Sequence, residues 1–287
     1  MTTAVVGATG LIGSHVVRGL LARGEAVTAI VRDPGKAADL FGERPNLQIR
    51  AASFGDRRDI VEALAGARTV FLAMGSVDAE GVVQRTTIEA AASMHTIAQV
   101  TRLSVLNASQ HSLGINQRAH HSIDEFAAVA GVPYSTIRPA VFSASLLASA
   151  RQIRGTRRWT GLAGTGRVAL IDHRDVAAVG VRVLTDPTLW GTHHDLTGPV
   201  PLSWPEVADL LSAEIGERVT FEVATERQML DALTSVVPAG TAELLIAREW
   251  AILAGENEFT TRTVEEITGS APRPITEFLR DYRSDFV

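Results

Sequence analysis

Short apolar runs alternate with amphipathic segments along the first two-thirds of the chain. The apolar runs are rich in β-branched residues, as strands covered on both faces are, and occupy residues 3–6, 26–31, 47–52, 69–73, 102–108 and 135–138. Segments with helical periodicity lie between them, at 12–23, 56–65, 80–100 and 119–130. This alternation predicts an α/β fold with a doubly wound parallel sheet, the Rossmann arrangement.

The pattern changes after Pro139. Residues 143–168 are basic and contain glycines, 171–183 has the periodicity of a helix returning to the sheet, and 185–287 is irregular and rich in proline. We therefore expect a dinucleotide-binding Rossmann domain over 1–142, to which 169–185 returns. A smaller C-terminal lobe, formed by 143–168 and 186–287, is expected to bind the substrate.

Composition narrows the functional classes. The chain has 287 residues, a net charge of −5 and no cysteine, which excludes disulfides and thiolate metal sites and disfavours nucleic acid as a partner. No apolar run approaches the roughly 20 residues that span a bilayer, and the first strand starts too early for a signal peptide. We expect a cytoplasmic protein that binds a small molecule and not a membrane; a homodimer is compatible with the sequence.

A glycine-rich turn follows the first apolar run. Residues 4–13 read AVVGATGLIG and lead into an amphipathic segment. Gly7 permits a tight turn, Gly10 lets the backbone approach a pyrophosphate, and Gly13 lets the helix pack closely. Together with the apolar run at 26–31 this makes a complete βαβ unit, which predicts a dinucleotide site. The alternative is an ordinary turn in some other α/β protein.

The end of the second strand indicates which dinucleotide binds. Arg32 stands first there, followed by Asp33, with Lys36 one helical turn further on. A guanidinium suits the 2′-phosphate of NADP(H), whereas NAD(H) favours an acidic residue. NADP(H) is therefore the predicted cofactor. The alternative is a solvated turn in which Arg32 pairs with Asp33.

The chain resembles the NmrA-like branch of the atypical short-chain dehydrogenases/reductases, which includes NADPH-dependent quinone reductase-like proteins. The resemblance rests on GATGLIG at 7–13, VRDP at 31–34, AGVPYSTIRP at 130–139, DHRDVA at 172–177 and LTGP at 196–199. It implies that the following residues contact the cofactor: Gly7, Thr9, Gly10, Leu11, Ile12, Gly13, Arg32, Lys36, Ser53, Phe54, Ala73, Met74, Gly75, Pro139 and Phe142. Ser53 stands where the family usually has an acidic residue, and Met74 can equally fill the core.

The usual catalytic pair of the wider superfamily, Tyr-x-x-x-Lys, is absent. The only lysine is Lys36, and the resemblance places Asn116 at the tyrosine position and His120 at the lysine position. The remaining catalytic candidates are His111 and Ser109, after the fifth strand, and His120, beside the ribose. These side chains can equally be surface or helix-capping groups. No metal site is predicted, because His111, His120 and His121 lack metal-ligand spacing.

These features favour an NADPH-dependent reductase that delivers hydride to a quinone, a ketone or a similar conjugated or aromatic small molecule. The arginine-rich and alanine-rich composition is compatible with a role in tailoring secondary metabolites. A quinone-like acceptor needs less help from an acid, which fits a chain without the Tyr-Lys pair. The alternative is a non-enzymatic NADP(H)-binding redox sensor of the NmrA type. NADPH oxidation in the presence of quinones distinguishes the two.

Overall fold

The computed structural model describes residues 2–74 and 81–287. Its main sheet has seven strands in the order β3-β2-β1-β4-β5-β6-β9. Their bounds are β1 (Thr2–Val6), β2 (Ala26–Val31), β3 (Leu47–Ala51), β4 (Thr69–Leu72), β5 (Gln99–Leu103), β6 (Tyr134–Pro139) and β9 (His193–Leu196). Strands β1 to β6 pair in parallel, and the order reverses between β1 and β4. The predicted doubly wound sheet is confirmed, and ligands of such sheets bind at this reversal point.

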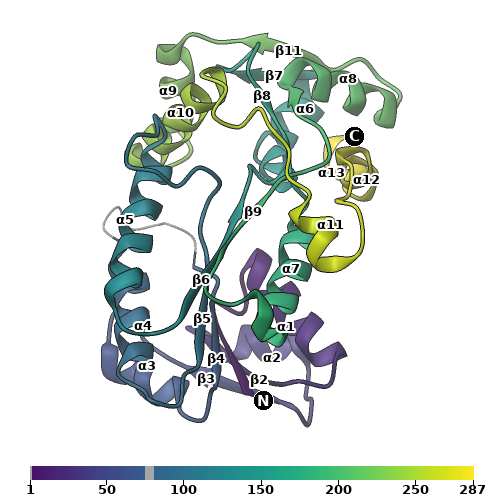
Figure 1. The fold of residues 1–287 in the computed structure, drawn as a ribbon. Helices are drawn as coiled ribbons and strands as arrows, with labels where there is room; N and C mark the ends of the chain where they lie inside the picture. The colour runs from purple at the N-terminus through teal and green to yellow at the C-terminus, as the bar shows by residue number, and fades with distance from the viewer. Residues whose placement is uncertain (1, 75–80) are drawn as a thin grey trace. The chain divides into compact units, whose positions relative to one another are not determined.

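Helices cover both faces of the sheet (Figure 1). On one face lie α1 (Leu11–Ala22), α2 (Pro34–Phe41) and α7 (His173–Thr185); on the other lie α3 (Arg57–Leu64), α4 (Val82–Ala92) and α5 (Ile115–Val129). Apolar side chains of the strands fill the space beneath them, among them Val70, Leu72 and Val100, which are fully buried. A membrane crossing needs a longer and more apolar helix than any in the described part of the chain.

The chain divides into two compact units. The first comprises residues 1–105, 119–138 and 173–194, and the second comprises 106–118, 139–172 and 195–287. These bounds differ from the expected domains, because 106–118, 139–142 and 169–172 belong to the second unit and 186–194 to the first. The segment that carries Ser109 and His111 is thus part of the unit expected to bind substrate.

The second unit contains more regular structure than the sequence predicts. It holds the 3₁₀ helix Ser143–Ser149, α6 (Ala150–Thr156), β7 (Arg158–Gly161), β8 (Arg167–Val168), β10 (Leu202–Ser203), α8 (Trp204–Ile215), β11 (Thr220–Val223), α9 (Glu226–Thr234), α10 (Ala239–Leu253), α11 (Thr263–Thr268), α12 (Ile275–Asp281) and α13 (Arg283–Phe286). The expectation of irregular structure over 185–287 is wrong because the prolines begin helices. Pro205 opens α8, and Pro238 and Pro274 are the N-caps of α10 and α12.

The fifth strand and the helix before it also differ from the expected bounds. The strand expected at 102–108 is β5, Gln99–Leu103, and the helix expected at 80–100 is α4, which ends at Ala92. The sequence at the start of β5 does not resemble a buried strand, because it contains polar residues. Three of them are nevertheless fully buried: Gln99, Thr101 and Arg102. The apolar Leu106 is buried in the loop that follows, which made that loop resemble a strand.

Candidate active site

The glycine turn after β1 lies directly against the end of β4. Gly7 has φ +79°, a conformation that favours glycine. A Cβ at this position would stand 2.8 Å from the carbonyl oxygen of Ala73 and 3.3 Å from Sδ of Met74. Both the backbone conformation and the close approach therefore require glycine. The contact also brings Gly7, Ala73 and Met74 together, as the sequence predicts.

Gly13 and Gly10 serve different purposes. A Cβ on Gly13 would stand 2.3 Å from the carbonyl oxygen of Gly7, so close packing of α1 on the turn requires glycine there. Gly10 has φ −78°, and its Cβ would meet only the Gly7 carbonyl oxygen, at 3.3 Å. The backbone conformation does not require glycine at position 10, although a Cβ there would make a tight contact. The missing side chain is what a phosphate approaching the backbone needs.

The start of α1 provides backbone donors beside Gly10. Gly10 is the N-cap and offers no side-chain cap, and the N–H groups of the first helical turn lack partners within the helix. Leu11 is exposed, whereas Ile12 is buried and can contribute only through its backbone. Thr9 is half-buried in the turn. Such a helix start suits the pyrophosphate of a dinucleotide in both geometry and dipole.

A cleft of about 820 Å³ lies where β2, β3 and β4 end. It is lined by Arg32, Ala51, Ala52, Ser53, Phe54, Gly55, Asp59, Met74, Val83 and Gln84. Arg32 is exposed and has no hydrogen bond or ion pair to any described residue. Asp33 instead caps α2, where its Oδ1 accepts a hydrogen bond from the backbone N–H of Lys36 at 3.1 Å. Pairing of Arg32 with Asp33 is therefore not observed, and the guanidinium is available to a ligand in the cleft.

A carboxylate lies beside Ser53, although residue 53 itself is not acidic. Asp59, in the first turn of α3, accepts a hydrogen bond from the backbone N–H of Ser53 through Oδ2 at 3.2 Å, and it lines the cleft. Phe54 is nearly buried in the same wall. Sequence reasoning missed Asp59 because no motif marks it; only the fold brings it to the end of β3.

The other expected cofactor residues are placed as follows. Lys36 is exposed in the first turn of α2. Pro139 ends β6, and Phe142 forms an isolated bridge with Ile171 in the second unit. Gly75 lies outside the described residues. For all of these residues, contact with the cofactor stays a prediction.

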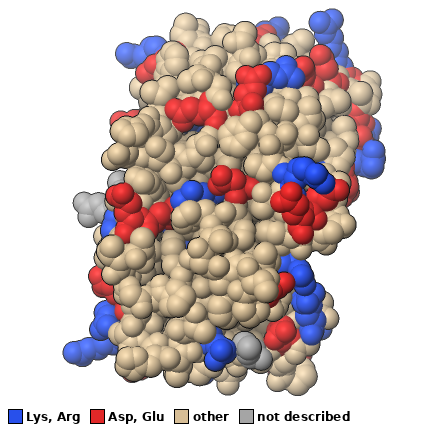
Figure 2. Space-filling model, in the orientation of Figure 1, with Lys and Arg blue, Asp and Glu red and all other residues tan. Residues whose placement is uncertain are grey.

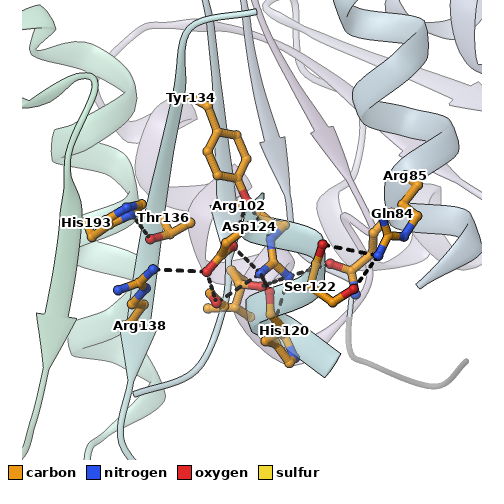
Figure 3. A network of polar contacts seen from close by, with 12 residues as sticks. Gln84, Arg85, Arg102, His120, Ser122, Asp124, Tyr134, Thr136, Arg138 and His193 are labelled. Atoms are coloured by element: carbon orange, nitrogen blue, oxygen red, sulfur yellow. Dashed lines mark hydrogen bonds and ion pairs between the residues drawn. The ribbon is translucent and has the colours of Figure 1, made fainter. Parts of the chain in front are cut away.

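A buried polar network connects β5 with α4 and α5 (Figure 3). Its centre is Arg102, whose side chain is fully buried. Among the acceptors of the guanidinium are the side chains of four residues: Gln84 Oε1 at 2.7 Å, Ser104 Oγ at 2.9 Å, Asp124 Oδ1 at 2.5 Å and Tyr134 Oη at 2.7 Å. Arg138 donates to Asp124 Oδ2 at 3.1 Å. Each charge in the network therefore faces an opposite charge, and Arg102 and Asp124 have further hydrogen bonds, as burial requires.

His120 belongs to this network. Its Nδ1 lies 2.9 Å from Nη1 of Arg102, and its side chain is almost fully buried. Burial and the Arg102 charge lower the pKa of His120 to about 3, so the imidazole is neutral and Nδ1 accepts from the guanidinium. Burial raises the pKa of Tyr134, whose hydroxyl donates to Asp124 at 2.9 Å. This arrangement favours a structural role for His120, and its expected contact with the ribose stays a prediction.

Gln84 joins the network to the cleft. Arg102 fixes its Oε1, the residue is 1% exposed, and its Nε2 has no hydrogen-bond partner among the described residues. Gln84 therefore presents an amide of fixed orientation at the wall of the cleft. Sequence reasoning missed Gln84 and Arg102. One signal was available, because a charged residue in a strand expected to be buried on both faces needs buried partners.

Ser109 and His111 lie in a loop of the second unit. His111 is exposed, its Nε2 is 3.1 Å from Gln110 Nε2, and its backbone N–H donates to Ser109 Oγ at 3.2 Å. Glu256 anchors this loop. Its carboxylate accepts from Ser112 Oγ at 2.5 Å and from the Leu113 N–H at 2.8 Å, and its carbonyl oxygen accepts from Asn107 Nδ2. The structure thus holds His111 on an anchored loop, open to solvent.

Comparison with known proteins assigns the family. The model of the NmrA-like family matches residues 1–283. The chain belongs to this family. It is 27% identical over 277 residues to quinone oxidoreductase 2 of Escherichia coli K12, covering 96% of each chain. It is 32% identical over 294 residues to the NAD(P)H azoreductase of Xenophilus azovorans, covering 98% of each.

Among solved structures, the NADPH complex of the E. coli NADPH-dependent quinone oxidoreductase QOR2 superposes on this chain with a TM-score of 0.90. The identity is 27%, and the alignment covers 98% of this chain and 99% of that one. The family resemblance deduced from the motifs is therefore confirmed over almost the whole chain, as is the fold.

Proposed function

We propose that this protein is an NADPH-dependent reductase whose acceptor is a quinone or a similarly conjugated small molecule. Two coarser expectations are confirmed by its relatives: the chain is an NAD(P)H-dependent oxidoreductase, and NADP(H) is its cofactor. The class of the acceptor and the roles of individual residues are the proposed part.

The observation that carries the proposal is the cleft at the ends of β2 to β4. Arg32, which has no partner among the described residues, suits a 2′-phosphate, and the missing side chain at Gly10 beside the start of α1 suits a pyrophosphate. Phe54 supplies an apolar surface for the adenine, and Asp59 supplies an acceptor for its amino group. These residues fit the cofactor, which supplies hydride when bound.

The chain's own residues limit what proton chemistry it can provide. Tyr134 is occupied by Arg102 and Asp124, and His120 is a neutral, buried acceptor. Neither is placed as a solvent-linked acid. His111 is the exposed candidate, with Ser109 beside it. An acceptor whose reduced oxyanion is stabilised by aromaticity needs little acid catalysis, which favours quinones over simple ketones.

The surface supports a small molecule as the partner. On the face drawn in Figure 2, acidic and basic side chains are intermixed, without a broad basic area of the kind that binds nucleic acid.

The test of the proposal is NADPH oxidation, followed at the cofactor's absorbance with a naphthoquinone, an azo dye and an aromatic ketone. We expect turnover with the quinone or the azo dye. NADPH binding without turnover of any of these acceptors would favour the sensor instead.

The assignment of Arg32 predicts a cofactor-selective effect. In Arg32→Ala, the 2′-phosphate loses a charge-assisted hydrogen bond, which is worth about 1.5–3 kcal/mol. We expect NADPH to bind roughly tenfold or more weakly. NADH lacks this phosphate, so its affinity should change little. Titration calorimetry with both cofactors measures the difference.

Arg68→Ala is the matched control for Arg32→Ala. Arg68 is also an exposed arginine, but it precedes β4 and so lies at the opposite edge of the sheet. Its replacement should leave both affinities unchanged. An equal loss for NADPH and NADH in Arg32→Ala would contradict the 2′-phosphate contact.

The assignment of His111 predicts a modest effect. General acids typically contribute about 10²–10⁴-fold to a rate, but a quinone acceptor should reduce this to about tenfold or less. We expect His111→Ala to lower kcat on a quinone slightly and on an aromatic ketone much more, with NADPH affinity unchanged. His95→Ala, at an exposed position of the first unit, is the control. Identical ratios for both acceptors would exclude His111 as the proton donor.

A further inference from the structure

A second cleft of about 840 Å³ lies entirely within the second unit. Residues of β7, β11 and α6 line it together with residues of α9 and α10, labelled in Figure 1. None of the cofactor or catalytic candidates lines it. The two clefts therefore share no residue.

Aromatic rings form one part of this cleft. Trp159 of β7 and Phe221 of β11 are paired in register, with ring centroids 5.1 Å apart and planes at 86°. The ring centroids of Trp204 and Trp159 are 5.2 Å apart. Both tryptophans are almost fully buried and Phe221 is half-buried, so the rings form an apolar floor of the cleft. The Trp204 indole N–H is already bonded to Glu249 Oε2 at 3.0 Å. This floor suits a planar ring system better than a flexible polar ligand.

Helix α9 contributes apolar side chains that the protein does not bury. A capping box between Thr225 and Gln228 specifies the helix locally, yet none of its residues is buried. Met229 and Leu233 line the cleft, and Val236, just beyond the helix, is 76% exposed. An amphipathic helix normally covers a core with its apolar face. Here that face borders the cleft, where a ligand could cover it.

Both carboxylates that line the cleft are already paired. Glu249 is buried, and its oxygens already accept from three donors, namely Trp204, the Ala163 N–H and Arg248. Glu222 is paired with Arg158 at 2.9 Å.

Two arginines complete the lining. Arg248 is only partly exposed, and its Nε has no partner among the described residues. Arg151 is exposed and has neither a hydrogen bond nor an ion pair to a described residue. The cleft therefore combines an aromatic floor with one guanidinium that is unpaired among the described residues, that of Arg151, and with that of Arg248, which is bonded to Glu249 through Nη2 but has an open Nε. Guanidinium groups bind carboxylate and sulfonate oxygens through paired hydrogen bonds.

We propose that this cleft binds a planar aromatic molecule that carries an anionic oxygen group. The rings pack against Trp159, Phe221 and the apolar side chains of α9, and the anion faces Arg151 and Arg248. Quinones with an acidic substituent belong to this chemical class. Binding of such a molecule in this cleft does not require that the protein reduce it.

The test uses two probes that differ only in charge, naphthalene-2-sulfonate and naphthalene-2-sulfonamide. Neither can accept hydride, so binding to the full-length protein without cofactor is independent of reductase activity. Titration calorimetry should show that the sulfonate binds at least tenfold more tightly than the sulfonamide. Equal affinities, or no binding of either probe at millimolar concentration, would overturn the proposal.

Variants locate the site. Arg151→Met should weaken the sulfonate several-fold and leave the sulfonamide unchanged, and Arg248→Met should do the same more strongly. Because Arg248→Met removes a partner of the buried Glu249, Arg248→Lys serves as a variant that keeps the charge. Val236→Asp, at an exposed position, should weaken both probes. Arg218→Met, an exposed arginine of the same unit outside the cleft, should change neither. Unchanged sulfonate affinity in folded Arg151→Met and Val236→Asp would exclude this cleft.

Discussion

Gly10→Val should abolish NADPH binding while leaving the protein folded. Gly10 has an ordinary φ of −78°, and an added Cβ would meet only one atom of the protein, the Gly7 carbonyl oxygen at 3.3 Å. The branched side chain would instead occupy the space that the pyrophosphate needs. Two lost charge-assisted hydrogen bonds at about 1.5–3 kcal/mol each weaken binding by roughly 10²–10⁴-fold. Titration calorimetry measures the affinity, and circular dichroism checks the fold.

Two other glycine variants serve as controls for Gly10→Val. Gly240→Val, in the exposed first turn of α10 with no atom near its Cβ position, should bind NADPH normally. Gly13→Ala should lower stability, because its Cβ would stand 2.3 Å from the Gly7 carbonyl oxygen. A folded Gly10→Val protein with undiminished affinity for NADPH would show that this turn does not hold the pyrophosphate.

The fold of the first unit was predictable because local rules determine it. The sequence shows these rules directly. The glycine spacing and the apolar runs reflect backbone geometry within a few residues, and Arg32 after the second strand reflects the positive charge that a 2′-phosphate needs. The cleft at the ends of β2 to β4 then follows from the parallel sheet. Asp59 was not predictable, since it reaches Ser53 only through the packing of α3.

The second half was harder to predict because its signals are ambiguous. Prolines suggested irregular chain, but Pro205 and Pro274 stand at helix starts, where proline is favoured. The anchoring of the loop around His111 by Glu256 joins residues far apart in sequence and leaves no local pattern. The strand β5 was misplaced because Arg102 is buried by partners on other elements.

Those partners make Arg102 the position at which a substitution should cost the most stability. Arg102→Leu would leave the Asp124 carboxylate, 6% exposed, without its closest charge, and would leave the acceptors on Gln84 and His120 unpaired. Removing one partner of a buried ion pair costs about 3–5 kcal/mol. We expect the free energy of unfolding, measured in urea at pH 7, to fall by that amount. Arg102→Lys should recover little, since an ammonium cannot reproduce the guanidinium's several directed hydrogen bonds.

The loss should depend on pH in a defined direction. Burial raises the pKa of Asp124, but Arg102, Arg138 and the Tyr134 hydroxyl together bring it below its ordinary value. A depressed carboxyl pKa stabilises the fold above the unfolded pKa, about 3.9, and this contribution disappears as the pH falls through the folded value. The difference between wild type and Arg102→Leu should therefore be largest at neutral pH and shrink as the pH falls below about 4.

A double variant separates the ion pair from simple packing. Arg102→Leu/Asp124→Leu removes the buried ion pair and leaves only Arg138, which is 18% exposed, without its carboxylate. It should be more stable than Arg102→Leu alone, because no carboxylate stays buried without its closest charge. Arg227→Leu breaks an exposed pair with Asp231 and should change stability by less than about 1 kcal/mol. If Arg102→Leu cost no more than Arg227→Leu, or if its cost did not fall in acid, the network would not be the source of the stability.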